Sequence, residues 1–297
     1  MATPHFEHHQ PSSLEDALDI LTRHRADVKL MGGGTDLVMK MRAGLLTPQH
    51  VVGLGRVGGL NRISYRDDDG LVIGGSARIS DVAVHPEVRQ HYPALAHACA
   101  VMATPQIRNM GTVAGNLANA APSADTAAPL LAYRASVVLV ERGGRRQVKL
   151  TDFFKGPGLT DMEPTEILEA IRVPAPPQRC GSAYQRLSER SQVDIAAVGV
   201  AGSLALDLAG VIIGVRLALG AVAPTPVRCP EAEALLEGQA PSPELLRRAS
   251  VACVRASRPI DDLRASANYR RSMVQVLSQR VLEQCLARAK GEPVPQC

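Results

Sequence analysis

Residues 104–125 read TPQIRNMGTVAGNLANAAPSAD, and this stretch determines how the rest of the chain is interpreted. Arg108 is its only charged side chain before Asp125, and its centre, residues 111–116, consists of small residues. Small residues let the backbone approach another molecule closely, because few side chains stand in the way. Short polar side chains that hydrogen-bond over small distances follow: Asn116, Asn119, Ser123 and Asp125. The stretch predicts a loop that cradles a large, partly anionic small molecule, although a turn region without a ligand has a similar composition.

A second glycine-rich loop lies nearer the N-terminus. Residues 28–31 (VKLM) have the pattern of a short buried strand, residues 32–36 (GGGTD) follow, and residues 37–42 have the pattern of a helical turn. Thr35 or Asp36 stands where a helix N-cap belongs. Strand, glycines and helix start together offer free N–H groups and a positive dipole end to a phosphate, although the last glycine of the Rossmann fingerprint is missing. Two such loops predict a pyrophosphate held from two sides.

Several further segments match one known family. In chain order, the matching segments are KLMGGGTD (29–36), PQIRN (105–109), TVAGN (112–116), APSADT (121–126), EIL (166–168), SAY (182–184), DIAAV (194–198) and YRR (269–271). With them the chain resembles the FAD-binding subunit of the molybdenum hydroxylases, a family that includes medium subunits of carbon monoxide dehydrogenases, bacterial xanthine dehydrogenases and 4-hydroxybenzoyl-CoA reductases. The resemblance covers nearly the whole chain, and residues 105–126 are its most specific part.

The expected fold is α+β. The resemblance implies an FAD-binding domain of the PCMH type with two subdomains over residues 1–176. A smaller domain with a three-stranded antiparallel sheet and helices would follow over residues 177–290. The sequence Pro-Ala-Pro-Pro at 174–177 is stiff and poor in N–H donors, so the boundary is placed there.

The resemblance also implies roles for individual residues. The first loop would lie along the adenosine pyrophosphate through Lys29, Leu30, Met31, Gly32, Gly33, Gly34, Thr35 and Asp36. The second would hold the pyrophosphate and the ribityl region from the other side through Gly111, Thr112, Ala114, Gly115, Asn116 and Ser123. Asp125 would hold a ribose or ribityl hydroxyl.

Four more positions are implied near the ends of the cofactor. Met102 would lie near the adenine, Leu168 against the adenine or the flavin edge, and Ile195 against the ring face. Ordinary core packing explains these three apolar residues equally well. Arg186 stands where many relatives carry a lysine near the flavin; a cation there stabilises reduced flavin, so the exchange bears on the flavin potential.

The partners implied by the resemblance are a large molybdopterin-binding subunit and a small [2Fe–2S] subunit, assembled as a dimer of heterotrimers. Electrons would pass from the iron–sulfur clusters to FAD in this chain and on to NAD, a quinone, oxygen or ferredoxin. Two alternatives remain at this point. One is a self-contained flavin oxidoreductase of the vanillyl-alcohol-oxidase type, and the other is a non-enzymatic nucleotide-binding assembly protein.

Composition limits the other classes of function. The 297 residues include 45% hydrophobic and 21% charged residues, and the net charge of +4 is too small and too dispersed to indicate nucleic-acid binding. The longest apolar run, 195–206, is shorter than the roughly 20 residues of a membrane span, and the first residues do not form a signal peptide. The six cysteines are scattered, which favours reduced thiols over a metal cluster. We therefore expect a cytoplasmic protein.

Two other motifs are weighed against plain structure. Residues 53–58 spell Gly-x-Gly-x-x-Gly, but a turn and a strand pattern follow, so a dinucleotide site is not expected there. Gly74 and Gly75 either approach the flavin or simply turn the chain. His5, His8 and His9 have the spacing of metal ligands, but an exposed tract is the preferred interpretation.

Hydrophobic spacing predicts the remaining elements. Helices are expected over 14–21, 93–101, 125–133, 231–236, 243–255 and 267–289. Asp125 is the predicted N-cap of the helix over 125–133. Strands are expected over 63–65, 71–73, 137–140, 147–150, 167–173, 183–187, 197–206 and 211–221.

Overall fold

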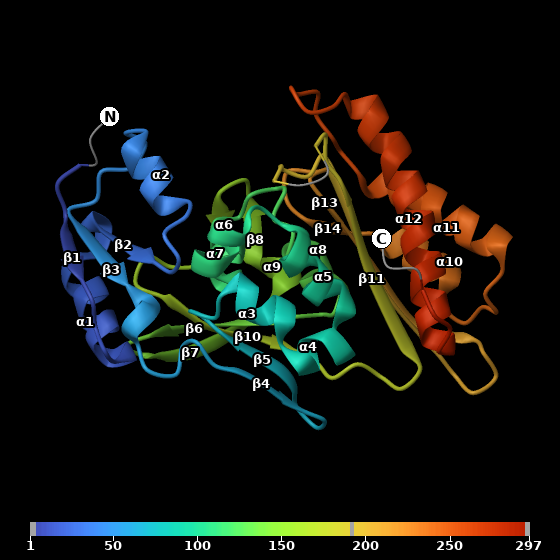
Figure 1. The fold of residues 1–297 in the computed structure, drawn as a ribbon, viewed down its shortest axis with the longest axis horizontal. Helices are drawn as coiled ribbons and strands as arrows, with labels where there is room; N and C mark the ends of the chain where they lie inside the picture. Colours follow the sequence, from blue (N-terminus) through green and yellow to red (C-terminus); the bar gives the residue numbers. More distant parts are fainter. Residues whose placement is uncertain (1–3, 191–192, 295–297) are drawn as a thin grey trace.

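The computed structural model describes residues 4–190 and 193–294, and three parts lie side by side in it (Figure 1). The N-terminal part is a parallel sheet in the order β1–β3–β2. Ser13 accepts a hydrogen bond from the N–H of Asp16, so the predicted cap of the first helix is confirmed. Leu18 and Leu21 of that helix pack on the sheet. The elements are β1 (Glu7–His9), α1 (Leu14–His24), β2 (Val28–Met31), α2 (Leu37–Arg42) and β3 (His50–Gly53), with short 3-10 turns at Arg25–Asp27 and Leu54–Arg56.

The middle part is built on an antiparallel sheet in the order β4–β5–β10–β6–β7. The two predicted hairpins are present, and β10 returns late in the chain to pair with β5 and β6. The strands are β4 (Ile63–Arg66), β5 (Gly70–Gly74), β6 (Ser136–Glu141), β7 (Gly144–Lys149) and β10 (Ile167–Val173). The helices are α3 (Ile79–Val84), α4 (Pro86–His91), α5 (Pro93–Val101), α6 (Pro105–Met110), α7 (Val113–Ala118), α8 (Ala127–Ala132) and α9 (Leu150–Phe153), and β8 (Phe154–Gly156) pairs with β9 (Leu159–Thr160).

The C-terminal part is an antiparallel sheet in the order β11–β12–β13–β14. The three predicted strands are confirmed, and a two-residue strand adds a fourth. Helix α12 covers one face, while α5 and α8 of the middle part pack on the other. Strand β12 is buried on both faces of the sheet, which explains its nearly continuous apolar sequence. The elements are β11 (Cys180–Leu187), β12 (Val198–Leu206), β13 (Ile212–Gly220), β14 (Val227–Arg228), α10 (Pro230–Leu236), α11 (Pro243–Ala256) and α12 (Ala267–Lys290).

The stretch at 104–125 is more ordered than a loop, and the prediction of a loop was wrong in this respect. Two short helices, α6 and α7, lie within it. Thr104 caps the first by accepting from the N–H of Ile107, and Thr112 caps the second by accepting from the N–H of Gly115. A threonine before each helix supplies the acceptor that the first turn lacks.

The prediction that Asp125 caps a helix was wrong, whereas Asp36 does stand at the predicted cap position. Helix α8 begins at Ala127, with Thr126 at the cap position, and the side chain of Asp125 turns elsewhere. Asp36 holds the cap position of α2 but makes no capping hydrogen bond; its carboxylate accepts from Asn119. A carboxylate that is engaged by a side chain from another segment no longer serves its own helix.

The Gly-x-Gly-x-x-Gly at 53–58 lies at the end of β3 and in a 3-10 turn, and the chain then enters β4. The helix that a dinucleotide site needs does not follow it, as expected. Among residues 4–190 and 193–294, no helix is long and apolar enough to cross a membrane.

Candidate cofactor site

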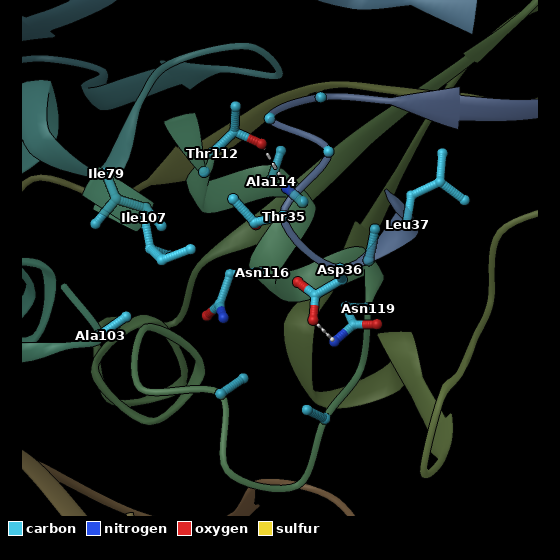
Figure 2. Close-up of a pocket in the computed structure, with 18 of the residues that line it drawn as sticks. Thr35, Asp36, Leu37, Ile79, Ala103, Ile107, Thr112, Ala114, Asn116 and Asn119 are labelled. Atoms are coloured by element: carbon cyan, nitrogen blue, oxygen red, sulfur yellow. Dashed lines mark hydrogen bonds between the residues drawn. The ribbon is translucent and has the colours of Figure 1, made fainter. Parts of the chain in front are cut away.

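A cavity of about 960 Å³ lies where the N-terminal and middle parts meet. Its wall is built from the loop at 32–36, which follows β2, and from the segment at 102–125. Figure 2 shows side chains of both segments around the cavity, with Asp36 of the first pointing toward Asn119 of the second. The cavity is as large as the upper range of small-molecule sites, which is about 300–1,000 Å³.

The two loops touch each other directly. A Cβ atom added at Gly33 would lie 1.9 Å from the carbonyl oxygen of Met110 and 2.6 Å from the Cα of Gly111. A Cβ at Gly32 would lie 2.9 Å from the Oγ1 of Thr112. Only glycine allows this approach of backbone to backbone. The loops predicted to grip one molecule from two sides do converge.

The first loop presents free backbone donors to the cavity. In the described part of the chain, the N–H groups of Gly33, Gly34, Thr35 and Asp36 have no protein acceptor. Gly34 has a φ of 74°, which residues with a side chain rarely adopt. Successive unpaired N–H groups that face a concave space are the usual way in which backbone binds a phosphate. These unpaired N–H groups show that the wall fits a diphosphate.

Side chains tie the two loops together at the rim. Asn119 donates to the Oδ1 of Asp36 at 3.1 Å and accepts from the Nζ of Lys40 at 2.7 Å. Asp36 and Lys40 are one helical turn apart, so a single amide joins both to the second segment. This clamp fixes the spacing between the two walls.

Within the second segment, several polar side chains hydrogen-bond to nearby backbone or to a neighbouring side chain. The hydroxyl of Thr112 accepts from the N–H of Gly115 at 2.9 Å, and the Oδ1 of Asn116 accepts from the hydroxyl of Thr126 at 2.6 Å. Ala103, also on the wall, has a φ of 47°. A strained residue of this kind persists only where its surroundings determine its conformation. Hydrogen bonds within the chain thus hold the shape of this wall.

Asp125 is the buried charge of the cavity wall. Its carboxylate accepts from the hydroxyl of Tyr184 at 2.6 Å and from Arg186 Nη1 at 3.2 Å. Burial raises the pKa of Asp125, while Arg186 and Tyr184 act in the opposite direction. Burial and the neighbouring carboxylate raise the pKa of Tyr184 well above its ordinary value, so its hydroxyl remains a donor. The C-terminal sheet thus holds a side chain that faces the cavity.

The predicted site residues come together with one exception. Residues 29–36, Met102, Leu168 and every predicted position within 111–125 line the cavity. Met102 and Leu168 are at the same time buried in the core, so core packing is confirmed and their contact with the cofactor stays a prediction. Ile195 also lines the cavity, and its side chain is 48% exposed. Of the two glycines at 74 and 75, Gly75 belongs to the cavity wall and Gly74 does not.

Arg186 is the exception. It lies behind Asp125, outside the cavity wall, and also donates to the carbonyl oxygens of Val101 and Asp194. Arg186 was predicted to lie near the flavin because of its position in the sequence. The position of its charge depends instead on the length and direction of the side chain.

Other wall residues were missed by sequence reasoning. Most are apolar or small and carried no chemical signal: Leu37, Leu46, Leu54, Ile79, Ala103, Ile107, Ala118, Ala121, Ala124, Gly158, Met162 and Val193. Others are polar: Lys40, Thr104, Arg190, Asp194 and Arg264. Of these polar residues, Lys40 could have been predicted from the sequence, because it follows Asp36 by one helical turn.

Comparison with known proteins agrees with this geometry. The family model described as "FAD binding domain in molybdopterin dehydrogenase" matches residues 4–176, and the "CO dehydrogenase flavoprotein C-terminal domain" matches residues 182–285. The chain belongs to the family of FAD-binding subunits of molybdenum hydroxylases.

Relatives in this family match over nearly their full length. The putative xanthine dehydrogenase FAD-binding subunit of Escherichia coli is 32% identical over 96% of this chain and 97% of that protein. The carbon monoxide dehydrogenase medium chain of Hydrogenophaga pseudoflava is 34% identical over 97% of this chain and 99% of that protein. A solved carbon monoxide dehydrogenase from the same organism superimposes with a TM-score of 0.92, at 34% identity, over 97% of this chain and 99% of the matched chain.

Quinoline 2-oxidoreductase from Pseudomonas putida 86 superimposes with a TM-score of 0.90, at 27% identity, over 97% of this chain and 99% of the matched chain. The α+β fold, with its FAD-binding and flavoprotein C-terminal regions, is thus confirmed. The chain is the FAD-carrying electron-transfer subunit of a multi-subunit oxidoreductase of the molybdenum hydroxylase family.

Proposed function

We propose that FAD lies in the cavity with its diphosphate between the two glycine-containing loops. The contact of Gly33 with Met110 and Gly111, beside four free N–H groups, carries this assignment. When bound, FAD accepts electrons from one partner and releases them to another. The residues assigned to it are Lys29 to Asp36, Met102, Gly111, Thr112, Ala114, Gly115, Asn116, Ser123, Asp125 and Leu168.

Each group of residues has its own task in this proposal. The N–H groups of residues 33–36 donate to the diphosphate, where backbone donors cost little entropy. Asp125 accepts from a hydroxyl of the cofactor, and Tyr184 and Arg186 hold the carboxylate in its orientation. Arg186 therefore acts through Asp125, and its positive charge reaches the cofactor only behind a carboxylate.

We further propose that the partners are a large molybdopterin-binding subunit and a small [2Fe–2S] subunit, arranged as a dimer of heterotrimers. Electrons from the clusters would leave through FAD to an external acceptor such as NAD, a quinone, oxygen or ferredoxin. We place the boundary between the two domains at residues 176 and 177 and the complex in the cytoplasm, where the free thiols of Cys99, Cys180, Cys229, Cys253 and Cys285 remain reduced.

The test is reconstitution of the purified chain. Incubation with FAD and removal of the excess by gel filtration should leave about one flavin per chain, measured from the visible absorbance of oxidised flavin. Dithionite should bleach this absorbance, and the isolated chain should turn over no small substrate until its partner subunits are added. A chain that retains no flavin would refute the proposal. Turnover by the isolated chain would favour the self-contained oxidoreductase, and a bound nucleotide without redox change would favour the assembly protein.

A further inference from the structure

Three imidazole rings meet in the N-terminal part, outside the wall of the cofactor cavity. His9 ends β1, His24 ends α1 and His50 begins β3. When one nitrogen is taken from each ring, the three nitrogens all lie within 4.8 Å of one another. The Nε2 of His9 is 3.1 Å from the Nδ1 of His50, and the rings of His24 and His50 are 3.6 Å apart at their centroids.

The sequence pointed to other histidines as possible ligands, and an exposed tract without a metal was preferred. His5, His8 and His9 have the spacing of a metal motif, but successive side chains of a strand point to opposite faces. His8 accordingly lies against Gly53, where an added Cβ would be 3.0 Å from its Nε2. Only His9 of that tract joins the cluster; the other two rings come from distant elements.

The topology of the fold brings these rings together. The parallel pairing of β1 with β3 places Glu7 opposite His50, and the pairing of β2 with β3 places Val28 opposite the same residue. Helix α1 ends at His24, directly before the short turn into β2. Three chain segments thus deliver one imidazole each to a single end of the sheet.

A carboxylate completes the set. The Oε2 of Glu7 is 3.3 Å from the Nδ1 of His50, and its Oε1 is 3.7 Å from the Nδ1 of His9. The side chains of His9 and His50 are 17% and 19% exposed, whereas Glu7 is 65% exposed. A cation can therefore enter from solvent, and the ligand next to solvent is the flexible one.

We propose that His9, His24 and His50, with Glu7 as an outer ligand, bind a divalent transition-metal ion of the zinc class. Imidazole nitrogen and carboxylate oxygen are ligands that zinc accepts in tetrahedral sites. Tetrahedral ligation at about 2.0–2.1 Å requires nitrogens about 3.3 Å apart. The pair of His9 and His50 already meets this spacing, and rotation of the third ring brings the remaining nitrogen closer.

The ion would stabilise the fold and would take no part in electron transfer. It would tie β1, α1 and β3 together at one end of the sheet. The glycine loop leaves from the other end of β2, which at about 3.3 Å per residue is on the order of 13 Å away. A metal bound here stabilises the part of the chain that carries the first wall of the cofactor cavity.

Zinc retention by the full-length chain, without a histidine tag, tests the proposal. The chain is incubated with zinc chloride, passed through gel filtration, and analysed for metal by mass spectrometry. We expect about one zinc per chain in the wild type and in the matched control His8→Asn. His24→Asn and His50→Gln should lose affinity by more than the roughly 10- to 100-fold that removal of an outer-shell partner costs.

Equal zinc retention in wild type, His24→Asn and His50→Gln would overturn the proposal, as would a wild type that retains none. Circular-dichroism melting shows whether each variant is folded. If a variant does not fold, zinc-edge X-ray absorption of the loaded wild type decides the question without mutation. The signature of three imidazole ligands is expected, and a shell of oxygen only would contradict it.

Discussion

The two walls of the cofactor cavity are built on opposite plans. The loop at 32–36 has almost no side chains, and its N–H groups are free. The segment at 104–125 is organised by two threonine-capped helices and by a hydrogen bond from the hydroxyl of Thr126 to Asn116. The first wall offers backbone donors, whereas several polar side chains of the second already have partners within the chain.

This difference separates binding from positioning. A wall of free backbone donors gains its partners only when the ligand arrives, so its contribution appears in affinity. A wall that is internally satisfied contributes shape and rigidity, which lower the cost of ordering the ligand. Substitutions on the two walls should therefore separate loss of binding from loss of stability.

The largest effect on FAD affinity is expected at the contact between the walls. Gly33→Ala places a Cβ 1.9 Å from the backbone of Met110, and neither segment has a flexible atom there that can move aside. Overpacking of this kind costs roughly 1–3 kcal/mol. The expected loss in FAD affinity is about 10- to 100-fold, at 1.4 kcal/mol for each factor of ten. Fluorescence titration of the flavin-free chain measures it.

Gly55→Ala is the matched control. This glycine lies in the Gly-x-Gly-x-x-Gly motif, and an added Cβ there meets nothing within 4 Å. FAD affinity should remain that of the wild type. If Gly55→Ala weakened FAD and Gly33→Ala did not, the cofactor would belong to the motif at 53–58 and the assignment of the cavity would be wrong.

The same contrast explains what the sequence predicts and what it does not. The glycine loop was identified correctly, because a strand, three glycines and a helix start are local features that residues 28–42 contain in full. The position of Asp125 was mistaken for a helix cap, because its partners Tyr184 and Arg186 come from a strand far along the chain. Local chemistry can be predicted from a sequence, whereas pairing between distant segments requires the fold.

An effect on the stability of the chain, and not on FAD affinity, should distinguish the two aspartates of the cavity. Asp125→Asn removes the counter-charge of Arg186, whose side chain is only 6% exposed. Loss of one partner from a buried pair costs about 3–5 kcal/mol, so a clear fall in the free energy of unfolding is expected. Asp36→Asn, on the exposed wall, should change stability far less. Urea unfolding of both flavin-free variants compares them, and equal losses would contradict the division of roles.

The apolar wall residues extend the lesson about prediction. Leu54, Ile79 and Met162 line the cavity, yet in the sequence they are indistinguishable from any core residue. Their role as cavity residues depends on which surfaces remain uncovered when the N-terminal and middle parts pack together. Resemblance to a family supplied most of the polar positions, but the structure was needed to place Arg186 behind Asp125.

The smallest effect concerns the amide that joins the walls. Asn119→Ala removes the donor to Asp36 and the acceptor for Lys40 while leaving both walls otherwise intact. A hydrogen bond of this kind contributes about 0.5–1.5 kcal/mol, so FAD should dissociate up to about tenfold faster. Asn109→Ala, an exposed asparagine of α6 outside the cavity wall, is the control and should leave the rate unchanged. Stopped-flow fluorescence measures both rates. If Asn119→Ala releases FAD no faster than the control, the glycine contact alone holds the walls together, and the clamp serves only to position α2.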